Sequence, residues 1–416
     1  MKINQCRVCD DSKLEVFLDL GDQPHGDSLI SEEQLPNKDV RYPLKTCFCY
    51  SCSTVQINYT VPKETMFEHY LYVSGTTRTL KDHFANTTNA LIAYLSLKPG
   101  DFVVDIGSND GTWLETYKGT GIKTLGIDGA KNLSAIANSK GIETWPLFFN
   151  EQVADKILTL KGQPQLVTAA GVFFHLEELH SVTSGIAKLI GDTGTFCIQA
   201  IYLGGMIDQN KFDQIYHEHL TYWTLTTVSK LLEKHNLEIY QAQFIPIHGG
   251  SIQILAAARN TKKVDKSVLE ILQLEKTKKY NEIETYKNFS NRVRDIGTKL
   301  TDILKEFKVK NKIVYALGAP IKGSTLLNSF NIGTDLVKCA VEINELKIGK
   351  YMPGVRIPIL DEKIAGYPDV YLVLAWNFLP ELIKKNMQFL LNGGELLVPV
   401  PMPFVVNKSN YLNYLN

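Results

Sequence analysis

Short apolar runs alternate with helical stretches through the middle of this chain, and that alternation constrains its fold more than any other feature. The runs Phe102–Ile106, Leu166–Ala170 and Thr195–Gln199 have the pattern of buried strands, and Thr124–Asp128 is a further run that ends in an acid. Strands that alternate with helices form a parallel sheet with helices on both faces. The sequence therefore predicts an α/β fold for this region.

A second alternation of the same kind occupies the last third of the chain, with apolar runs at Ile313–Leu317, Val337–Val341 and Val370–Leu374. Residues 260–310 separate the two series and are rich in Lys and Glu, with Leu, Ile and Val at helical spacing. That pattern indicates an amphipathic helical connector. We expect a central α/β domain at 76–259, the connector at 260–310 and a smaller α/β domain at 311–416.

The composition is that of a soluble globular protein. A length of 416 residues favours two or three domains, and 44% apolar with 21% charged residues is ordinary. Lys plus Arg and Asp plus Glu both number 44, so no basic excess points to nucleic acid. The first ten residues are polar, and no apolar run reaches the roughly 20 residues that cross a bilayer. We expect a cytoplasmic protein with no nucleic-acid or membrane partner, and the sequence leaves monomer and dimer open.

Four of the seven cysteines form two CxxC pairs near the N-terminus, Cys6 with Cys9 and Cys49 with Cys52. Paired cysteines in a cytoplasmic chain indicate a metal more often than a disulfide. Two such pairs complete a tetrahedral shell of four thiolates with no open position for water, which favours structural zinc. Cys47 competes with Cys49, because spacing does not rank them, and surface thiols without a metal are the remaining alternative. We expect a zinc-binding module at residues 1–75 with Cys6, Cys9, Cys49 and Cys52 as ligands.

The segment Asp105-Ile106-Gly107-Ser108-Asn109-Asp110-Gly111 lies where a strand ends and a helix should begin. Glycines there let the backbone approach a ligand, and a helix N-terminus supplies donors. Asp128 closes the next strand, where an acid accepts hydrogen bonds from ribose hydroxyls. The GxGxxG spacing of NAD sites is absent, and Asp105 before the glycine is typical of methyltransferases, where it would face the cationic methionine end. The loop therefore favours S-adenosylmethionine, and an ordinary tight turn is the alternative.

The segment Tyr216-His217-Glu218-His219 belongs to the densest set of ionisable groups in the chain. Histidine titrates near neutrality and can remove a proton, and a neighbouring carboxylate can raise its basicity or orient its ring. The histidines are two positions apart, whereas a zinc-protease helix places them four apart, so a metal is disfavoured. A bland polar loop is the alternative.

Two further segments bring histidines to the same region. Phe173-Phe174-His175-Leu176 follows the strand that ends at Ala170, at the carboxyl edge where open parallel sheets bind ligands. His248-Gly249-Gly250-Ser251 is a tight turn that can present backbone donors to an anion. Alone, each of these histidines would more often be structural.

Taken together, these segments resemble the S-adenosylmethionine-dependent sugar C-methyltransferases that act on nucleotide-linked 4-keto-deoxy sugars. The resemblance covers essentially the whole chain. It includes Leu20–Pro24, Gly318-Ala319-Pro320-Ile321-Lys322-Gly323, Tyr351–Gly354 and Ala375-Trp376-Asn377. The resemblance implies an N-terminal zinc-binding domain, a central Rossmann-like class I methyltransferase domain and a C-terminal Rossmann-like domain that binds the nucleotide sugar.

The resemblance also implies roles for single residues. His219 would be the base that removes the proton on sugar carbon 3, with Tyr216 and Glu218 orienting it and hydrogen-bonding the enolate. His175 would lie on the opposite side of the pocket. The cofactor-binding set would be Asp105, Gly107, Asn109, Gly111, Asp128 and Phe148. The substrate-binding set would be Tyr72, His248 and Lys322, with Lys322 at the nucleotide diphosphate.

Two positions depart from the family pattern: Gly171 stands where Asn is usual, and Gln253 where Arg is usual. The loss of an amide near the sugar would change which hydroxyl or ketone of the sugar the enzyme recognises. The sequence therefore does not predict the particular sugar or nucleotide base. Three other functions compete. An NAD-linked sugar epimerase or dehydrogenase would need a GxGxxG loop and a Tyr-x-x-x-Lys pair, which are missing at the right places. A degenerate binding subunit is opposed by the intact Asp105 and Asp128. A methyltransferase for another carbonyl acceptor is chemically the nearest alternative.

Overall fold

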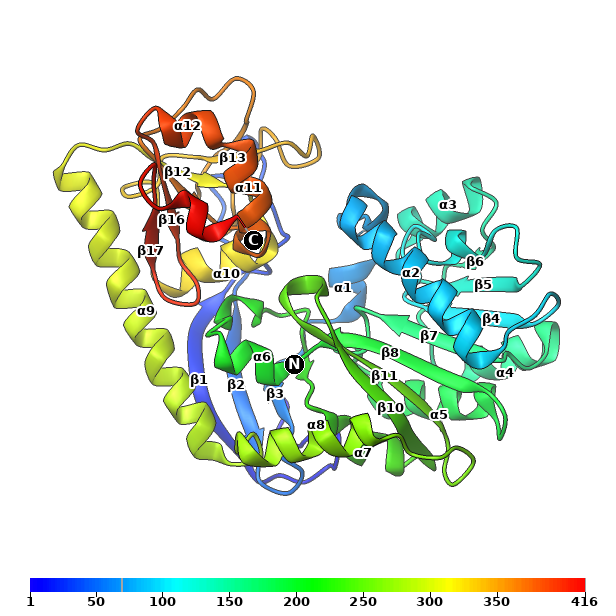
Figure 1. Ribbon diagram of the computed structural model, residues 1–416. Coiled ribbons are helices and arrows are strands. Elements are labelled where there is room, and N and C mark those ends of the chain that lie inside the picture. The colour runs from blue at the N-terminus through cyan, green and yellow to red at the C-terminus, as the bar shows by residue number, and fades with distance from the viewer. Residues whose placement is uncertain (69, 416) are drawn as a thin grey trace.

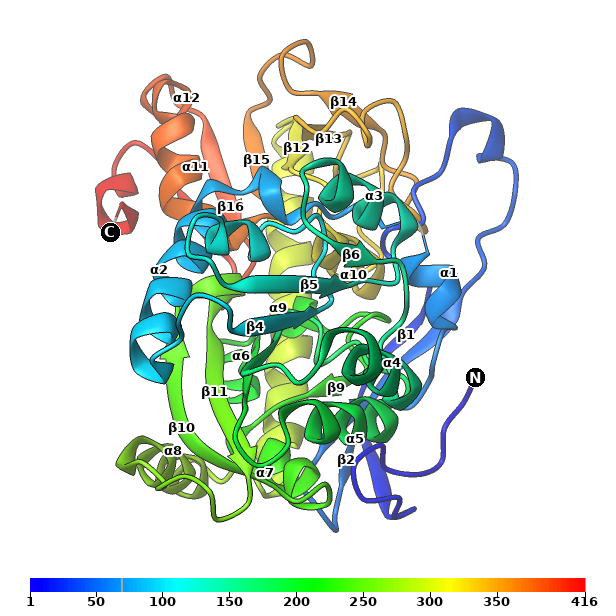
Figure 2. The same ribbon diagram turned by 90° about the vertical axis from the view of Figure 1, so that its right-hand side faces the viewer.

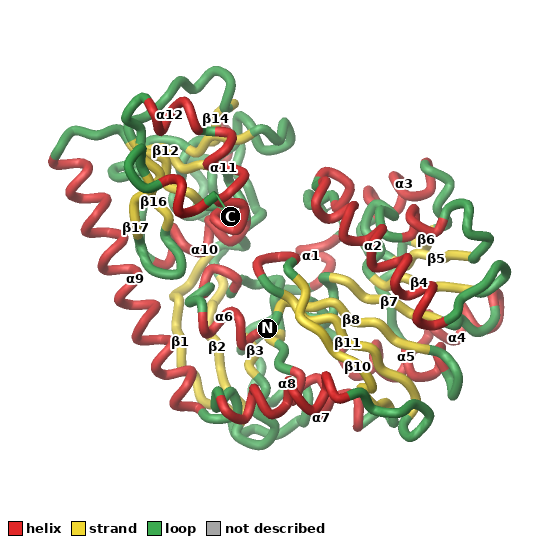
Figure 3. Tube along the Cα trace, in the orientation of Figure 1, coloured by secondary structure: helices red, strands yellow, loops and turns green. Residues whose placement is uncertain are grey.

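The computed structural model describes residues 1–68 and 70–415 and contains three sheets of four, seven and six strands. In Figure 1 the seven-stranded sheet lies on the right and the six-stranded sheet at the upper left, with the four-stranded sheet between and below them. The same division into strands and helices is visible along the Cα trace in Figure 3.

The N-terminal sheet is antiparallel and includes one strand from the central part of the chain. Its order is β1-β2-β3-β9, with bounds Leu14–Gln23, Tyr42–Cys49, Val55–Ile57 and Thr221–Tyr222. Val55 pairs with Tyr222, and the Ile57 N–H donates to the Leu220 carbonyl at 3.1 Å. The sheet therefore holds the backbone directly after His219.

The central sheet has the order β10-β11-β8-β7-β4-β5-β6. Its strands are β4 (Phe102–Ile106), β5 (Lys123–Ile127), β6 (Thr144–Trp145), β7 (Leu166–Ala170), β8 (Thr195–Ile201), β10 (Leu237–Ile245) and β11 (Ser251–Ala258). The four strands expected from the sequence pair in parallel, whereas β11 is antiparallel to both β8 and β10. The sheet is thus mixed, because β10 and β11 form a hairpin that needs no crossover helix.

The helices between residues 63 and 233 are α1 (Lys63–Phe67), α2 (Arg78–Leu95), α3 (Lys131–Ser139), α4 (Glu151–Lys161), α5 (Leu179–Ile190), α6 (Leu203–Asp208) and α7 (Leu225–Glu233). Of these, α3, α5 and α7 contact strands of this sheet. On α5, Val182, Ile186 and Leu189 recur at helical spacing and are all buried. Asn150 caps α4, since its side-chain oxygen accepts the Val153 N–H at 3.0 Å.

The connector is two helices, α8 (Lys266–Thr277) and the long α9 (Ile283–Val309). Figure 2 shows α9 running behind the central domain toward the C-terminal sheet. Tyr286, Phe289, Val293, Ile296 and Leu300 form its buried stripe, as the periodicity of the sequence predicts.

The C-terminal sheet has the order β14-β13-β12-β15-β16-β17 and is parallel except for β17. Its strands are β12 (Val314–Leu317), β13 (Ala340–Glu342), β14 (Ile359–Asp361), β15 (Val370–Val373), β16 (Glu395–Val398) and β17 (Phe404–Val406). Its helices are α10 (Ile321–Ser329), α11 (Leu379–Lys385) and α12 (Met387–Leu391). The boundaries at 75/76, 259/260 and 310/311 stay predictions. Within 1–68 and 70–415, no helix has the length and apolar character needed to span a membrane.

Candidate active site and metal centre

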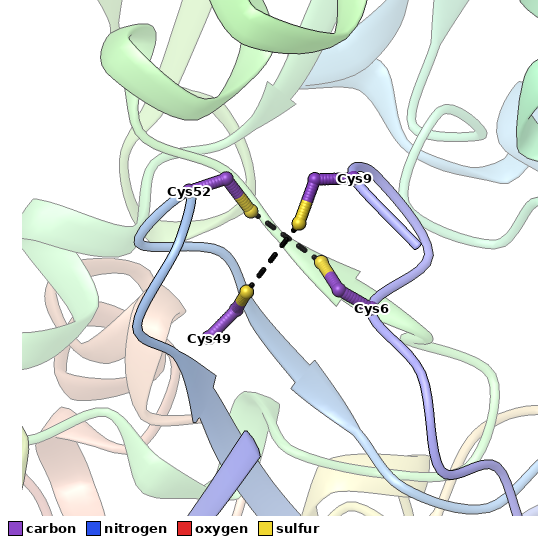
Figure 4. Close-up of side chains that lie close together, drawn as sticks. All are labelled: Cys6, Cys9, Cys49 and Cys52. Atoms are coloured by element: carbon purple, nitrogen blue, oxygen red, sulfur yellow. Dashed lines mark hydrogen bonds between the residues drawn. The ribbon is translucent and has the colours of Figure 1, made fainter. Parts of the chain in front are cut away.

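Four cysteine thiols converge at one end of the N-terminal sheet, as Figure 4 shows. The sulfur atoms of Cys6, Cys9, Cys49 and Cys52 all lie within 4.8 Å of one another. The Sγ–Sγ distance is 3.4 Å for Cys6 and Cys52 and 3.5 Å for Cys9 and Cys49. A tetrahedral ion with about 2.3 Å bonds to sulfur would separate its ligands by a little under 4 Å, so the arrangement fits zinc.

The two CxxC turns have the same backbone geometry. The Asp10 N–H donates to the Cys6 carbonyl at 2.9 Å, and the Ser53 N–H donates to the Cys49 carbonyl at 2.8 Å. Asp10 and Ser53 both have a positive φ, of 64° and 65°. Each turn therefore folds its two thiols to the same side.

Cys47 lies outside this cluster. Its thiol donates to the Gln56 carbonyl at 3.4 Å, and burial raises the pKa of the thiol to about 11. Cys47 and Cys49 are both on β2, and spacing alone does not show which of them is the metal ligand. Because the Cys47 thiol is hydrogen-bonded to Gln56 on neighbouring β3, the structure favours Cys49 as the ligand.

The loop after β4 is shaped by its glycines and by Asp128. Gly107 has φ +70°, and a Cβ there would lie 2.7 Å from the Val172 side chain. The Asp128 carboxylate accepts the Asn109 N–H at 2.7 Å and the Ala130 N–H at 2.8 Å. Asp128, directly after β5, therefore lies beside the loop after β4, and its side chain is half-buried.

Two details differ from the sequence-based expectation. The loop leads into a 3-10 turn at Leu114–Tyr117, where an α-helix was expected, because Gly119 and Gly121 follow with positive φ. Asp105 is buried and accepts a 2.5 Å hydrogen bond from the Thr168 hydroxyl, and burial raises the pKa of its carboxyl to about 7. The backbone N–H groups of the loop donate within the fold as well: those of Gly107 and Ser108 donate to the Ile127 carbonyl at 2.8 and 3.3 Å, and that of Asn109 donates to Asp128.

A segment before α2 lies over this loop. Asn109 donates to the Tyr72 carbonyl at 3.1 Å and accepts the Ser74 N–H at 2.9 Å. Tyr72 keeps 41% of its surface exposed. Beyond Asp128, the half-buried Phe148 ring packs so closely on Gly129 that a Cβ there would lie 2.2 Å from it. Phe148, expected in the cofactor-binding set, therefore lies beside Gly129, whereas Tyr72, expected at the substrate, contacts the loop through its backbone carbonyl.

Glu218 is fully buried between two donors from distant parts of the chain. His25 Nε2 lies 2.9 Å from one carboxylate oxygen, and the Tyr70 hydroxyl donates to the other at 2.8 Å. Burial alone would raise the pKa of Glu218, but the hydrogen bond and charge of His25 hold it below its usual value. The pKa of His25 is correspondingly raised, against the effect of its own burial. Both shifts favour an ion pair between an ionised Glu218 and a protonated His25.

His219 has one defined tautomer. Its Nδ1 lies 2.7 Å from the Gln214 carbonyl, which can only accept, so Nδ1 carries the hydrogen and Nε2 keeps its lone pair. Burial, together with the nearby His175, lowers the pKa of His219 well below its ordinary value. The ring is therefore neutral and able to accept a proton.

Aromatic rings surround His219. Ring centroids lie 3.9 Å away for Tyr216, 4.5 Å for Phe174 and 5.1 Å for His175. His175 is a direct neighbour of His219, so it does not lie across the pocket as expected. Its Nδ1 is buried with no hydrogen-bond partner among the described residues, and burial lowers the pKa of the ring to about 4.

The two unusual positions meet at one place, near His248. The Gly171 N–H donates to the Gln199 carbonyl at 2.9 Å, and the Gln199 amide donates to Gln253 at 2.8 Å. A Cβ at Gly171 would lie 3.9 Å from His248 Nε2. Because Gly171 has no side chain, that space beside His248 stays open. His83 Nε2, on α2, lies 3.0 Å from the Gln199 side-chain oxygen and extends this polar row.

Sequence reasoning missed His25 and Tyr70. His25 is 193 positions from Glu218 and Tyr70 is 148 positions away, so no local spacing connects them. The signals present were a histidine directly after the Leu20–Pro24 turn and a tyrosine two positions before Tyr72. His217, in contrast, lies in the predicted cluster but donates to the Tyr42 carbonyl of β2 at 3.2 Å, a structural contact.

Comparison with known proteins agrees with this arrangement over the whole chain. A model of a zinc binding domain matches residues 6–67, a methyltransferase domain matches residues 78–242, and a C-methyltransferase C-terminal domain matches residues 246–401. The C-methyltransferase NovU of Streptomyces niveus is 34% identical over 413 residues, covering 99% of this chain and 98% of that protein. This chain belongs to the C-methyltransferase family. It is an S-adenosylmethionine-dependent C-methyltransferase with a zinc-binding domain, which confirms the predicted enzyme class, cofactors and α/β fold class.

Solved structures match the chain in part. Magnesium protoporphyrin IX methyltransferase from Synechocystis, with bound S-adenosylmethionine, is 16% identical and covers 44% of this chain and 85% of its own, with a TM-score of 0.33. The PH0226 protein of Pyrococcus horikoshii is 14% identical and covers 47% of this chain and 98% of its own, with a TM-score of 0.37. The family assignment does not rest on these partial matches.

Proposed function

We propose that this C-methyltransferase methylates carbon 3 of a nucleotide-linked 4-keto-6-deoxy sugar through an enolate. The observation that carries the proposal is the neutral, buried imidazole of His219, whose tautomer is fixed by Gln214. A carbon beside a ketone becomes a nucleophile only after a base removes its proton. A neutral imidazole with a free Nε2 lone pair can act as that base. A cytoplasmic location accords with the seven free cysteines.

In the proposed reaction, His219 Nε2 removes the proton on carbon 3, and the electron pair moves onto the ketone oxygen as an enolate. S-adenosylmethionine, when bound, would supply the electrophilic methyl group, which bonds to carbon 3 as its bond to sulfur breaks and S-adenosylhomocysteine leaves. His219 then holds the abstracted proton as an imidazolium. The Gln214 carbonyl stabilises that cation through Nδ1–H, because the hydrogen bond strengthens when the ring is charged.

Neighbouring groups of His219 would control the enolate. The Tyr216 phenol stays protonated because burial raises its pKa well above the ordinary value, so it can donate to a developing negative oxygen. Glu218 is ionised and does not donate; held by His25 and Tyr70, it fixes the segment that carries Tyr216 and His219. His175 would complete the wall of the pocket beside His219.

The remaining site residues are proposed as follows. Asp128 would accept hydrogen bonds from the ribose hydroxyls of the cofactor, and the loop with Asp105, Gly107, Asn109 and Gly111 would hold its methionine end, with Phe148 near the adenine. Tyr72, His248 and Lys322 would contact the nucleotide sugar. Cys6, Cys9, Cys49 and Cys52 would bind zinc, which supplies a closed structural centre.

The test is an assay of the purified enzyme with S-adenosylmethionine and a panel of nucleotide 4-keto-6-deoxy sugars in deuterated water. Product masses are recorded, and methylated products are located by NMR. We expect a methyl-sized mass gain on one sugar, with the new carbon at position 3. A methylated oxygen or another carbon would contradict the proposed position.

Two other outcomes decide between the alternatives. Deuterium uptake at carbon 3 without methyl gain would mean that the base works and that the offered sugar is the wrong one. Neither signal across the panel, with intact cofactor binding, would favour another carbonyl acceptor. Loss of cofactor binding as well would favour the degenerate binding subunit.

A further inference from the structure

The buried Lys211 and the half-buried Lys322 lie on one tryptophan where the central and C-terminal domains meet. Lys211 follows α6 in the central domain, while Lys322 on α10 and Trp376 after β15 belong to the C-terminal domain. The Nζ atoms lie 4.0 Å (Lys322) and 5.6 Å (Lys211) from the centroid of the Trp376 ring. Lys211 is only 7% exposed. Two cations are therefore held on one ring, away from bulk water.

Neither ammonium has an acidic partner. Lys211 donates to the Gly249 carbonyl and Lys322 to the Asn377 side-chain oxygen, and no carboxylate of residues 1–68 and 70–415 lies within 4.0 Å of either. Because an ammonium group has three hydrogens, both lysines retain donors for a further ligand. Buried charges without a partner are costly, so an anion at this place would stabilise the contact between the domains.

Asp213 is the nearby acid, and its hydrogen bonding is incomplete. One carboxylate oxygen accepts the Trp376 indole N–H at 2.5 Å, while the other is buried without a partner among the described residues. Burial raises the pKa of Asp213, although Lys322 acts to lower it. The free oxygen can accept a hydroxyl or N–H of a ligand that also reaches the lysines.

A chain of contacts connects these lysines with His219, the proposed base. Gln214 links the two places, because its carbonyl accepts His219 Nδ1–H and its side-chain amide donates to the His248 carbonyl at 3.3 Å. The turn that carries His248 also contacts Lys211, which donates to the carbonyl of the next residue, Gly249. A ligand with one end at His219 therefore has its other end within reach of the lysines.

We propose that Lys211 and Lys322 together bind the phosphate groups of the substrate, so that the anion joins the central and C-terminal domains. Asp213 accepts a hydrogen bond from the same ligand. This inference rests on the proposed nucleotide-linked substrate and adds Lys211, Asp213 and Trp376 to its binding site. Burial lowers the pKa of Lys322 to about 8, and Lys211 contributes to that lowering; a bound phosphate would reverse both effects.

The experiment measures binding, so it does not depend on methyl transfer. Thymidine diphosphate and inorganic pyrophosphate are titrated by calorimetry into the zinc-loaded full chain and into Lys211→Met, Lys322→Met and Lys211→Arg. Lys310→Met, an exposed lysine on the far end of α9, is the matched control. S-adenosylmethionine affinity and Tm are measured for every variant as readouts of a purely structural effect.

We expect both methionine variants to lose about 10- to 100-fold in affinity for thymidine diphosphate, the range for one hydrogen bond to a charged group. Lys211→Arg should recover part of that loss, and Lys310→Met should match the wild type. Wild-type affinity for Lys211→Met would overturn the proposal, as would a loss matched by equal losses in S-adenosylmethionine affinity and Tm. Failure of the wild type to bind either anion at millimolar concentration would also overturn it. Diphosphate binding without methylation of any sugar would support the anion site and count against the proposed sugar.

Discussion

His219 can be a base only while its Nε2 lone pair is free and its ring is held in place. The Gln214 carbonyl fixes the tautomer, and the rings of Phe174 and Tyr216 fix the plane. Asp128, which we propose to hold the cofactor, accepts the Asn109 and Ala130 N–H groups and has no hydrogen bond to His219 among the described residues, so cofactor binding should not depend on this ring. Binding of the cofactor and removal of the proton are therefore separable by substitution.

Replacing His219 by Asn should abolish methyl transfer and leave cofactor binding unchanged. Asn keeps a donor toward the Gln214 carbonyl but has no basic nitrogen, so kcat should fall by about 10²- to 10⁴-fold. The dissociation constant of S-adenosylmethionine should stay within about twofold by calorimetry. If that constant rises in step with the loss of kcat, His219 is part of the cofactor site and not the base.

His25 should act as a positioning residue through Glu218. In His25→Gln the hydrogen bond can persist but the positive charge is lost, so the pKa of Glu218 should rise. The ionised form of Glu218 would then be lost at a higher pH, and the acid limb of the kcat profile should move up, with kcat near neutrality reduced roughly tenfold. Tyr70→Phe removes the other hydrogen bond without removing a charge and should move that limb less. An unshifted pH profile in His25→Gln would contradict the role.

At the scale of elements, the zinc-binding domain holds the catalytic segment on two sides. β3 pairs with β9 directly after His219, and the chain after β1 brings His25 to Glu218. A third contact runs from His217 to β2. We therefore expect the metal centre to support the proposed active site through this backbone pairing.

Loss of zinc should reduce catalysis strongly while leaving cofactor binding intact. Cys52→Ser removes a proposed ligand, so the zinc content should fall well below one per chain and kcat should drop by about 100-fold as β9 and His25 move. S-adenosylmethionine should still bind, because its loop belongs to the central sheet. Zinc content by mass spectrometry, kcat and calorimetry check these points.

Cys47→Ser is the matched control on the same strand. Its thiol bonds to the Gln56 carbonyl and lies outside the cluster, and a serine hydroxyl can make the same bond. It should retain zinc and activity. Zinc loss in Cys47→Ser together with retention in Cys52→Ser would reverse the assigned ligand set.

For the whole molecule, buried neutral histidines should make stability depend on pH. Burial lowers the pKa of His175, His217 and His248 to about 4 each, against about 6.5 in an unfolded chain. Between these values the unfolded chain binds protons that the folded protein does not, so stability falls as the pH falls from 6.5 to 4. Each histidine contributes up to about 1.4 kcal/mol per pH unit. His219, whose pKa is also lowered, adds to this effect, whereas His25, Asp105 and Asp213, whose pKa values are raised, act in the opposite direction. The contribution of one histidine is therefore measured by comparing a variant with the wild type.

Urea unfolding at pH 7, 6 and 5 measures this dependence, with free zinc monitored to separate metal release. His217→Gln keeps a donor to the Tyr42 carbonyl without a titrating ring, so its stability should fall less steeply than that of the wild type, by up to about 1.4 kcal/mol per pH unit. The same pH dependence in His217→Gln and in the wild type would contradict the burial of this ring as a neutral group.

The sequence by itself determined the strands and the positions of the motifs, because both follow from local patterns. Phe102–Ile106 and Leu166–Ala170 form strands with the expected bounds, since buried parallel strands are continuous apolar runs. The CxxC pairs identified the metal module, because two residues between cysteines suffice to turn both thiols to one side. Repeated glycine and acid positions identified the cofactor loop for the same local reason.

Only the tertiary structure decided how those pieces act on one another. The choice of Cys49 over Cys47, the pairing of β9 with the zinc domain and the contacts of His25 and Tyr70 with Glu218 all join residues far apart in the chain. The direction of β11 and the position of His175 beside His219 also depend on how distant segments pack. A hydrogen bond or a buried charge depends on distance in space, and sequence spacing gives that distance only within one helix, strand or turn.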